Sequence, residues 1–131
     1  MQLSESLENY LETIHHIVKA KGASRAKDIA VSLKVNNSSV TEALKTLSAK
    51  GLVNYKRYDL ITLTDEGKVH AEIIVKRHQT LERFLVEALK LDQERADAVA
   101  CRIEHIVDEV IIEKIDKLTD YLQRKGSDWS C

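Results

Sequence analysis

Three side chains that can bind a transition metal lie close together in the C-terminal half of the chain. Cys101, Glu104 and His105 supply a thiol, a carboxylate and an imidazole at positions i, i+3 and i+4. On a helix, this spacing predicts that all three project from one face. Each is a ligand type for divalent transition metals. The alternative is a hydrated polar face, with Cys101 as a small buried hydrophobic residue.

Three ligands leave a metal site incomplete, so the chain must supply others. His78 and Glu82 are four residues apart, which is one helical turn, and both carry donor atoms. Glu8, Asn9 and Glu12 form a second group of candidates near the N-terminus. The hexapeptide that contains Cys101 does not by itself decide between a metal site and an ordinary polar surface.

Composition limits the class of protein. The chain has 131 residues, 44% of them hydrophobic, and contains no proline. This length fits one domain, or a small domain with an oligomerisation element, and the lack of proline favours long helices. No apolar run reaches the roughly 18 residues of a membrane span, and no secretory signal is visible. Cys101 and Cys131 could form one disulfide, but we expect a reducing cytoplasmic location.

The charged residues are unevenly distributed, although the net charge is only −1. Between Lys21 and Asp59 there are eight basic and three acidic residues. From residue 71 onward, 13 acidic residues face 10 basic ones. The basic N-terminal half is expected to contact phosphate, and the acidic C-terminal half is expected to have a different function.

The N-terminal half begins with two expected helices. Ser4 or Ser6 could cap the first, whose apolar residues repeat with a period of 3.6 and which ends near Gly22. The second covers about residues 25–33. Both place a single apolar stripe inward.

A third helix follows a short turn at residues 35–37. Asn37 or Ser38 is expected to cap it, and it ends near Gly51. Two helices joined by so short a turn form a helix-turn-helix. The second of them would direct polar side chains outward, namely Ser38, Ser39, Thr41, Glu42 and Lys45.

The next segment predicts a hairpin. Residues 52–55 and 60–63 are short β-type runs separated by four residues, two of them basic. Thr64 then caps another helix. A helix-turn-helix followed by a basic hairpin is a winged helix, so the predicted fold is mainly α with DNA as the expected partner. The alternative is a small globular core with no nucleic-acid role.

The remaining chain is expected to be helical over about 66–88, 96–107 and 108–122, with a break at 89–92. These helices carry more apolar surface than one short layer can bury, which usually marks a protein–protein interface. The alternative is that these side chains pack back on the winged helix. We predict a DNA-binding domain at 1–71 and a helical metal-binding and dimerisation domain at 72–131.

Several motifs closely resemble the diphtheria-toxin-repressor family of metal-dependent regulators. They span about residues 6–122 and include Glu8-Asn9-Tyr10-Leu11-Glu12, Ser38-Ser39-Val40-Thr41, Lys50-Gly51-Leu52-Val53, Leu63-Thr64-Asp65-Glu66-Gly67, Arg77-His78, Glu82-Arg83-Phe84-Leu85 and Ala100-Cys101-Arg102-Ile103-Glu104-His105. The chain ends where many relatives continue into an SH3-like third domain, and in that respect it looks like the shorter manganese-regulator branch.

The resemblance implies a set of metal ligands. These are Asn9, Glu12, His78, Glu82, Cys101, Glu104 and His105, with Asp97 at an ancillary position. Asn9 departs from the family pattern, because an amide is a weaker neutral ligand than an acid or methionine. Cys131 is similar in place to a C-terminal cysteine that helps bind an ancillary metal in some longer relatives.

The resemblance and the charge pattern together imply a DNA-contact set. It consists of Arg25, Lys27, Asn37, Ser38, Ser39, Thr41, Glu42, Lys45, Lys56 and Arg57. The hairpin tip departs from the family pattern at Tyr58-Asp59-Leu60, so Arg57 would take over a phosphate contact.

The implied function is repression of metal-uptake genes by a metal-loaded homodimer on a pseudo-palindromic operator. The activating ion is expected to be Mn(II) or Fe(II), with Zn(II), Co(II) and Ni(II) as alternatives. A metal-independent winged-helix regulator would share the N-terminal half but would not need the ligand set. A hydrolytic metalloenzyme would need a base or nucleophile that the sequence does not show, so we expect no enzymatic activity, no small-molecule substrate and no membrane partner.

Overall fold

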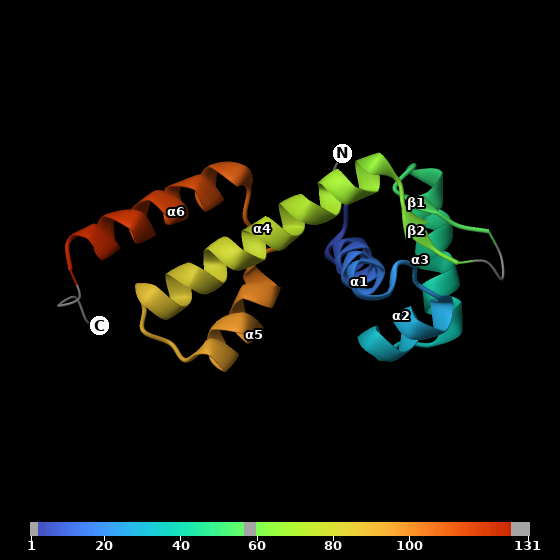
Figure 1. Ribbon diagram of the computed structural model, residues 1–131, viewed down its shortest axis with the longest axis horizontal. Helices are drawn as coiled ribbons and strands as arrows, with labels where there is room; N and C mark the ends of the chain where they lie inside the picture. The colour runs from blue at the N-terminus through green and yellow to red at the C-terminus, as the bar shows by residue number, and fades with distance from the viewer. Residues whose placement is uncertain (1–2, 57–59, 127–131) are drawn as a thin grey trace. The chain divides into compact units, whose positions relative to one another are not determined.

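The computed structural model describes residues 3–56 and 60–126 and is mainly α-helical, as predicted (Figure 1). The elements are α1 (Glu5–Lys21), α2 (Ala26–Leu33), α3 (Asn37–Ala49), β1 (Val53–Asn54), β2 (Thr62–Leu63), α4 (Asp65–Glu87), α5 (Gln93–Ile103) and α6 (Glu109–Arg124). They form two compact units, Met1–Ile73 and Ile74–Cys131, and α4 contributes residues to both.

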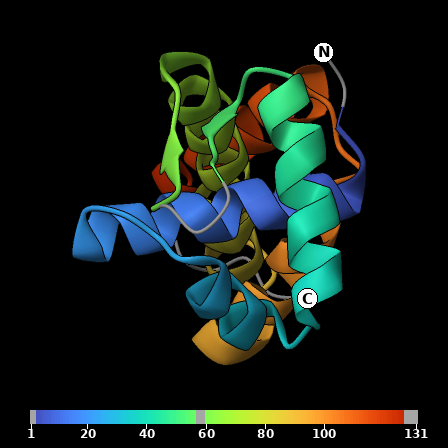
Figure 2. The ribbon, with the colours of Figure 1, turned by 90° about the vertical axis from the view of Figure 1, so that its right-hand side faces the viewer.

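The first unit is a helix-turn-helix with a hairpin. Its core is made by the apolar stripes of the first three helices, and Leu11, Ile14, Ile29, Leu44 and Leu47 are fully buried there. Helix α3 crosses α1 in Figure 2 and lies close to both α1 and α2. Burying five such side chains contributes on the order of 10 kcal/mol before the conformational entropy is subtracted. The outer face of α3 is thereby held on a rigid base.

The helix caps agree with the sequence at the first helix and differ at the third. Ser4 caps α1 by accepting a hydrogen bond from the backbone N–H of Leu7. At α3, the cap is Asn36, whose Oδ1 accepts from Ser39 N at 2.8 Å, so the expected cap at Asn37 or Ser38 was wrong. Asparagine at both 36 and 37 made the sequence ambiguous, and the chain uses the first because its backbone is extended there.

The hairpin is shorter than the two four-residue runs predicted. Val53 pairs with Leu63 and Asn54 with Thr62, while Ile61 forms a bridge to Ser24 before α2. Thr64 accepts a hydrogen bond from Gly67 N at 3.0 Å and so caps α4, as expected. An added Cβ at Gly67 would lie 1.9 Å from the Leu52 carbonyl oxygen. Only glycine therefore fits where α4 meets the start of the hairpin.

The second unit packs the later part of α4 against α5 and α6. Leu81, Leu85, Ala96, Ala100 and Ile112 form its core. Small alanines on α5 allow that helix to approach α4 closely, which brings the polar side chains beside them within reach of α4. These side chains include the metal-ligand candidates.

The predicted helix over 96–107 was wrong at both ends. Helix α5 begins at Gln93, because Asp92 accepts a hydrogen bond from Arg95 N at 2.8 Å, and it ends at Ile103. A second cap, Asp108, begins α6 by accepting from Ile111 N at 2.9 Å. Apolar periodicity continues across both boundaries, so only the caps mark them.

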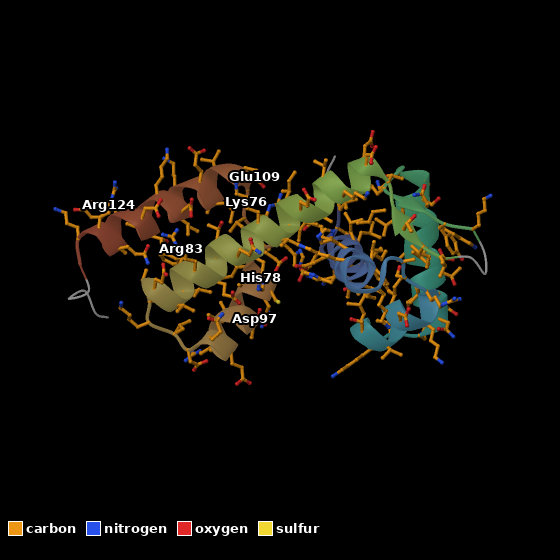
Figure 3. The ribbon with its side chains drawn as sticks, viewed as in Figure 1. Lys76, His78, Arg83, Asp97, Glu109 and Arg124 are labelled. Carbon is orange, nitrogen blue, oxygen red and sulfur yellow. The ribbon has the colours of Figure 1, made fainter. Side chains whose placement is uncertain are left out.

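Arg83 joins α4 to α6 through several contacts. Its guanidinium lies 3.0 Å from Asp116 Oδ1, 2.5 Å from Asp120 Oδ1 and 2.9 Å from Gln123 Oε1. Glu87 Oε2 lies 3.1 Å from its Nε atom. Figure 3 shows Arg83 on the side of α4 that faces α6. These bonds fix the rotation of α6 about its axis and hence which of its faces is exposed.

Some of the apolar side chains of the C-terminal helices are buried in the core, and others are exposed on the surface. Leu81 and Leu85 pack within the second unit. Helix α6 nevertheless exposes large apolar side chains, since Val110 is 60% and Leu118 46% accessible. Tyr121, on the same helix, is also exposed. Among the described residues, no helix is both long and apolar enough to cross a membrane.

Candidate metal centre and nucleic-acid interface

A group of donor side chains gathers around His78 on α4 (Figure 3). Donor atoms of His78, Asp97 and Cys101 all lie within 4.8 Å of one another. Asp97 and Cys101 are four residues apart, so α5 presents them on neighbouring turns toward α4. This group combines nitrogen, oxygen and sulfur donors, as a transition-metal site requires.

Both ring nitrogens of His78 have acidic neighbours. Nδ1 lies 2.8 Å from Glu104 Oε1 and 3.7 Å from the Cys101 sulfur. Nε2 lies 2.8 Å from Asp97 Oδ1 and 3.5 Å from Glu82 Oε2. The imidazole is therefore fixed in orientation from two sides, and a metal-binding histidine keeps one such bond while its other ring nitrogen faces the ion.

The electrostatic environment favours a positive charge at this position. The hydrogen bond that the imidazole donates to Glu104 is the largest influence on His78 and, with the one donated to Asp97, it raises the pKa of His78 to about 9 against the opposing effect of burial. An imidazolium thus lies among three carboxylates, those of Glu82, Asp97 and Glu104. The same excess of negative charge would stabilise a divalent cation.

Glu104 supplies a second indication of a ligand. Its side chain is fully buried, and Oε2 accepts no hydrogen bond from any residue that the structure describes. His105 Nε2 lies 3.9 Å from that oxygen, beyond hydrogen-bond distance. A buried carboxylate oxygen without a donor is costly unless a cation is bound nearby. The donor set and this oxygen together fit a divalent metal.

The sequence prediction that Cys101, Glu104 and His105 share one helical face is confirmed for Cys101 and Glu104, which both lie against His78 Nδ1, and is wrong for His105. Helix α5 ends at Ile103, and Glu104 is its C-cap, so His105 lies in the turn that follows. Cys101 is exposed whereas Glu104 is buried. The alternative of Cys101 as a small buried hydrophobic residue was therefore also wrong. The turn after Glu104 takes only His105 out of the helix.

The N-terminal candidates lie on α1 in the first unit. Asn9 and Glu12 are both half-buried there, and Glu12 Oε2 lies 3.8 Å from His16 Nε2. Glu8 is buried on the same helix. Their participation in a metal site remains a prediction. Cys131 lies outside the described residues.

Arg77 was not a candidate from the sequence. Its Nε lies 2.8 Å from Glu109 Oε1, and Nη1 donates to the Glu104 carbonyl at 3.4 Å. Arg77 therefore holds the turn that carries Glu104 against α4. In the sequence, its position directly before His78 was the feature that could have indicated a role for Arg77 at this site.

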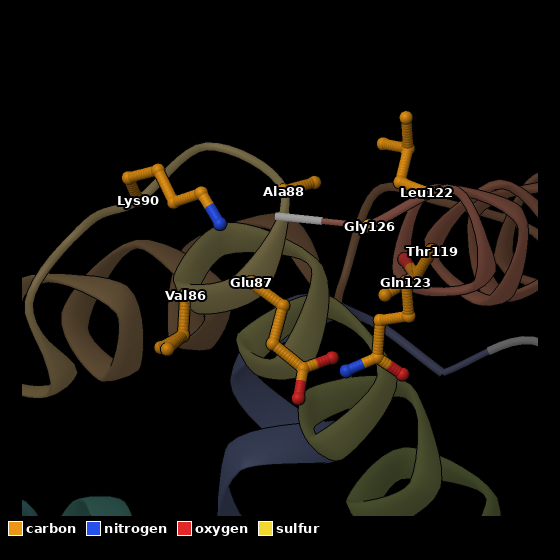
Figure 4. A pocket seen from close by; sticks show the side chains of 8 residues that line it. All are labelled: Val86, Glu87, Ala88, Lys90, Thr119, Leu122, Gln123 and Gly126. Carbon is orange, nitrogen blue, oxygen red and sulfur yellow. The ribbon is translucent and has the colours of Figure 1, made fainter. Parts of the chain in front are cut away.

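A cavity between the end of α4 and α6 is separate from this group (Figure 4). Glu87 is the single acidic side chain among its lining residues, which are Val86, Glu87, Ala88, Lys90, Thr119, Leu122, Gln123 and Gly126. Because one carboxylate cannot replace a set of converging ligands, the cavity is not a second metal site.

The expected DNA-contact side chains in the first unit are largely exposed. Exposed positions are Arg25, Lys27, Asn37, Ser38, Ser39, Glu42, Lys45 and Lys56. Thr41 is half-buried and donates its hydroxyl proton to the Asn37 carbonyl at 3.0 Å. Arg57 lies outside the described residues. Helix α3 therefore carries a polar face directed away from its core, as a recognition helix does.

A winged-helix unit followed by a helical unit with a metal-ligand group defines a class of metal-responsive DNA-binding regulators. Comparison with known families agrees. Residues 2–60 match the iron-dependent repressor N-terminal DNA-binding domain, and residues 64–127 match the iron-dependent repressor metal-binding and dimerisation domain. The chain belongs to this family, and the resemblance inferred from its motifs is confirmed.

Individual relatives support the same assignment. The chain is 38% identical over 114 residues to an uncharacterized HTH-type transcriptional regulator of Methanocaldococcus jannaschii, covering 86% of this chain and 91% of that one. It is 34% identical over 118 residues to MntR of Bacillus subtilis, covering 90% and 82%. It also resembles the structure of the manganese regulator SloR, with a TM-score of 0.76 and 27% identity over 92% of this chain, but spans only 55% of the SloR chain.

The family assignment establishes the general function. The chain is a DNA-binding transcriptional regulator of the metal-dependent type, and its second unit corresponds to the region through which such proteins dimerise. The metal-independent winged-helix regulator, which the sequence left open, is not supported.

Proposed function

We propose that this protein is a cytoplasmic repressor of metal-uptake genes that binds a pseudo-palindromic operator when loaded with Mn(II) or Fe(II). The proposal rests on one observation. The imidazole of His78, the carboxylate of Asp97 and the thiol of Cys101 have donor atoms that all lie within 4.8 Å of one another. We further propose that it has no catalytic activity. This rests on its family, whose members regulate transcription.

The proposed ligand set combines two groups. His78, Asp97, Cys101 and Glu104 are supported by their mutual distances, and Glu82 borders them at 3.5 Å from His78. His105 and Glu12 are added because they match the family motifs, and Asn9 because it occupies a ligand position of the family, although its amide departs from the pattern. A bound divalent ion would supply positive charge that offsets the negative charge of the carboxylates and the thiolate in this set.

Metal binding would act on DNA affinity through linkage. Two recognition helices must be spaced by about one helical turn of DNA, roughly 34 Å, to enter successive major grooves. An ion that binds the DNA-competent arrangement more tightly than other arrangements raises operator affinity by that difference. In this role the protein needs no nucleophile or general base.

The direct test is a titration of DNA binding with metal. Purified apo-protein is incubated with a fluorescent promoter fragment from its own operon and with Mn(II), Fe(II), Co(II), Ni(II) or Zn(II) at buffered free concentrations. We expect at least one of the five ions to increase affinity by about 5- to 150-fold, which is the usual range of allosteric coupling. Equal affinity with chelator and with every ion would contradict metal dependence.

A charge substitution on the recognition helix tests the DNA face. Lys45→Ala should weaken binding to all sequences and lower the slope of log affinity against log salt by about one, because one phosphate contact is lost. Lys45 is exposed on α3 and the substitution should leave the fold intact. The control is Arg95→Ala, which removes a positive charge from another exposed position, on α5. An unchanged slope for Lys45→Ala would place this residue away from the phosphates.

Cys101 is expected to bias the ion preference. A thiolate favours softer and borderline ions, whereas a carboxylate suits Mn(II). Cys101→Asp should therefore lower the free Mn(II) concentration needed for activation relative to that of Zn(II), on the order of tenfold. Ala98→Asp adds the same charge at another exposed position of α5 and should leave the ratio unchanged. Equal shifts in both variants would mean that charge alone, not coordination, is responsible.

A further inference from the structure

The outward face of α3 carries one acidic residue, Glu42, which is unusual for a surface that meets phosphate. Helix α3 buries Val40, Leu44 and Leu47 and leaves Glu42 exposed on the opposite side with Lys45. Among the described residues, Glu42 forms no ion pair, with Lys45 or any other base. Its carboxylate therefore presents a full negative charge at the centre of the proposed DNA face.

The hydroxyl groups on either side of Glu42 are already used. Thr41 donates to the Asn37 carbonyl at 3.0 Å, and Thr46 donates to the Glu42 carbonyl at 3.1 Å. A hydroxyl has only one proton, so neither threonine has a donor left for a base. Of Thr41, Glu42 and Thr46, Glu42 is thus the charged group that faces outward, and its carboxylate can only accept.

A carboxylate that enters the major groove needs a hydrogen-bond donor, and few groups on the base edges provide one. Phosphates repel it, so it cannot serve as a backbone contact. Guanine presents two acceptors in the major groove, while thymine presents an acceptor and a methyl group. Adenine pairs its amino donor with an acceptor, N7, on the same edge. Cytosine alone presents a donor, its N4 amino group, without an adjacent acceptor.

We propose that Glu42 is a specificity-determining residue that selects a cytosine in each operator half-site by accepting a hydrogen bond from its N4 amino group. This inference rests on the proposed DNA-binding function and specifies the base that the recognition helix reads. The position of Glu42 one turn after Ser38 and Ser39 on α3 places it where a recognition helix contacts base edges.

The test is selection from a randomised double-stranded DNA library, with the full chain and with Mn(II), Fe(II) or Zn(II) in parallel. The wild type should enrich cytosine at one position in each half-site. Glu42→Gln should change that position to adenine, because glutamine can pair with both N6 and N7. In competition between the two duplexes, we expect the preference to change by about tenfold or more, within the range of one base contact.

The matched control is Glu66→Gln, which makes the same change at an exposed acid in the first turn of α4. It should keep the cytosine. If Glu42→Gln keeps the wild-type base preference while binding DNA, the inference about Glu42 is wrong and the proposed function stands. If the wild type enriches no sequence with any of the three ions, the proposed function fails and the inference fails with it.

Discussion

Replacing His78 with alanine is expected to reduce metal affinity by at least about 100-fold, the upper end of what losing a supporting residue costs, and to remove metal-stimulated DNA binding. The reason is geometric. His78 on α4 contacts Asp97, Glu104 and Cys101 together, so its removal takes away the donor from α4 that meets those from α5 and its C-cap. Metal affinity is measured by equilibrium dialysis, and DNA affinity by fluorescence anisotropy.

Two further variants make this result interpretable. His70→Ala removes a half-buried histidine from the same helix, outside the donor group, and should retain metal response. Cys101→Ser changes an exposed ligand and so avoids a folding defect, yet it should also weaken Zn(II) binding. Full metal response in both His78→Ala and Cys101→Ser would disprove the site. Glu104 is unsuitable as the main variant because it is fully buried, and replacing it should lower stability.

Placing glutamate at both Ile111 and Leu118 is expected to convert the dimer to a monomer. Both side chains are more than 40% exposed on α6, seven residues apart and hence on one helical face. Two copies of this face would meet across a two-fold axis, so each substitution puts a charge into the interface twice. Operator affinity should then fall on the order of 100-fold or more, because the two half-sites are no longer bound by one linked molecule.

Sedimentation equilibrium measures the oligomeric state, and the fold is checked by circular dichroism. Val31→Glu is the matched control, since it introduces the same charge at an apolar side chain that is 71% exposed on α2. This control should remain dimeric. A double variant of Ile111 and Leu118 that stays dimeric would show that another face of the second unit forms the interface.

The sequence predicted the winged helix more accurately than the helical unit. In the first unit, apolar periodicity, the Ser4 cap and the Thr64 cap each indicated the same element that the structure shows. In the second unit, apolar residues continue without interruption between α5 and α6, and periodicity alone could not locate Ile103 as the end of α5. Boundaries there depend on single capping side chains, which carry a weaker signal than a repeated pattern.

The sequence by itself determined which residues are available as ligands. The motif around Cys101 and the histidine at 78 identified the donor types and the family without coordinates. Only the tertiary structure decided which donors meet. Asp97 was an ancillary candidate, yet its carboxylate lies 2.8 Å from His78, as does that of Glu104, whereas His105 lies in the turn after α5. The physical reason is that local spacing fixes direction only within one helix, while the distance between α4 and α5 is set by the packing of their apolar faces.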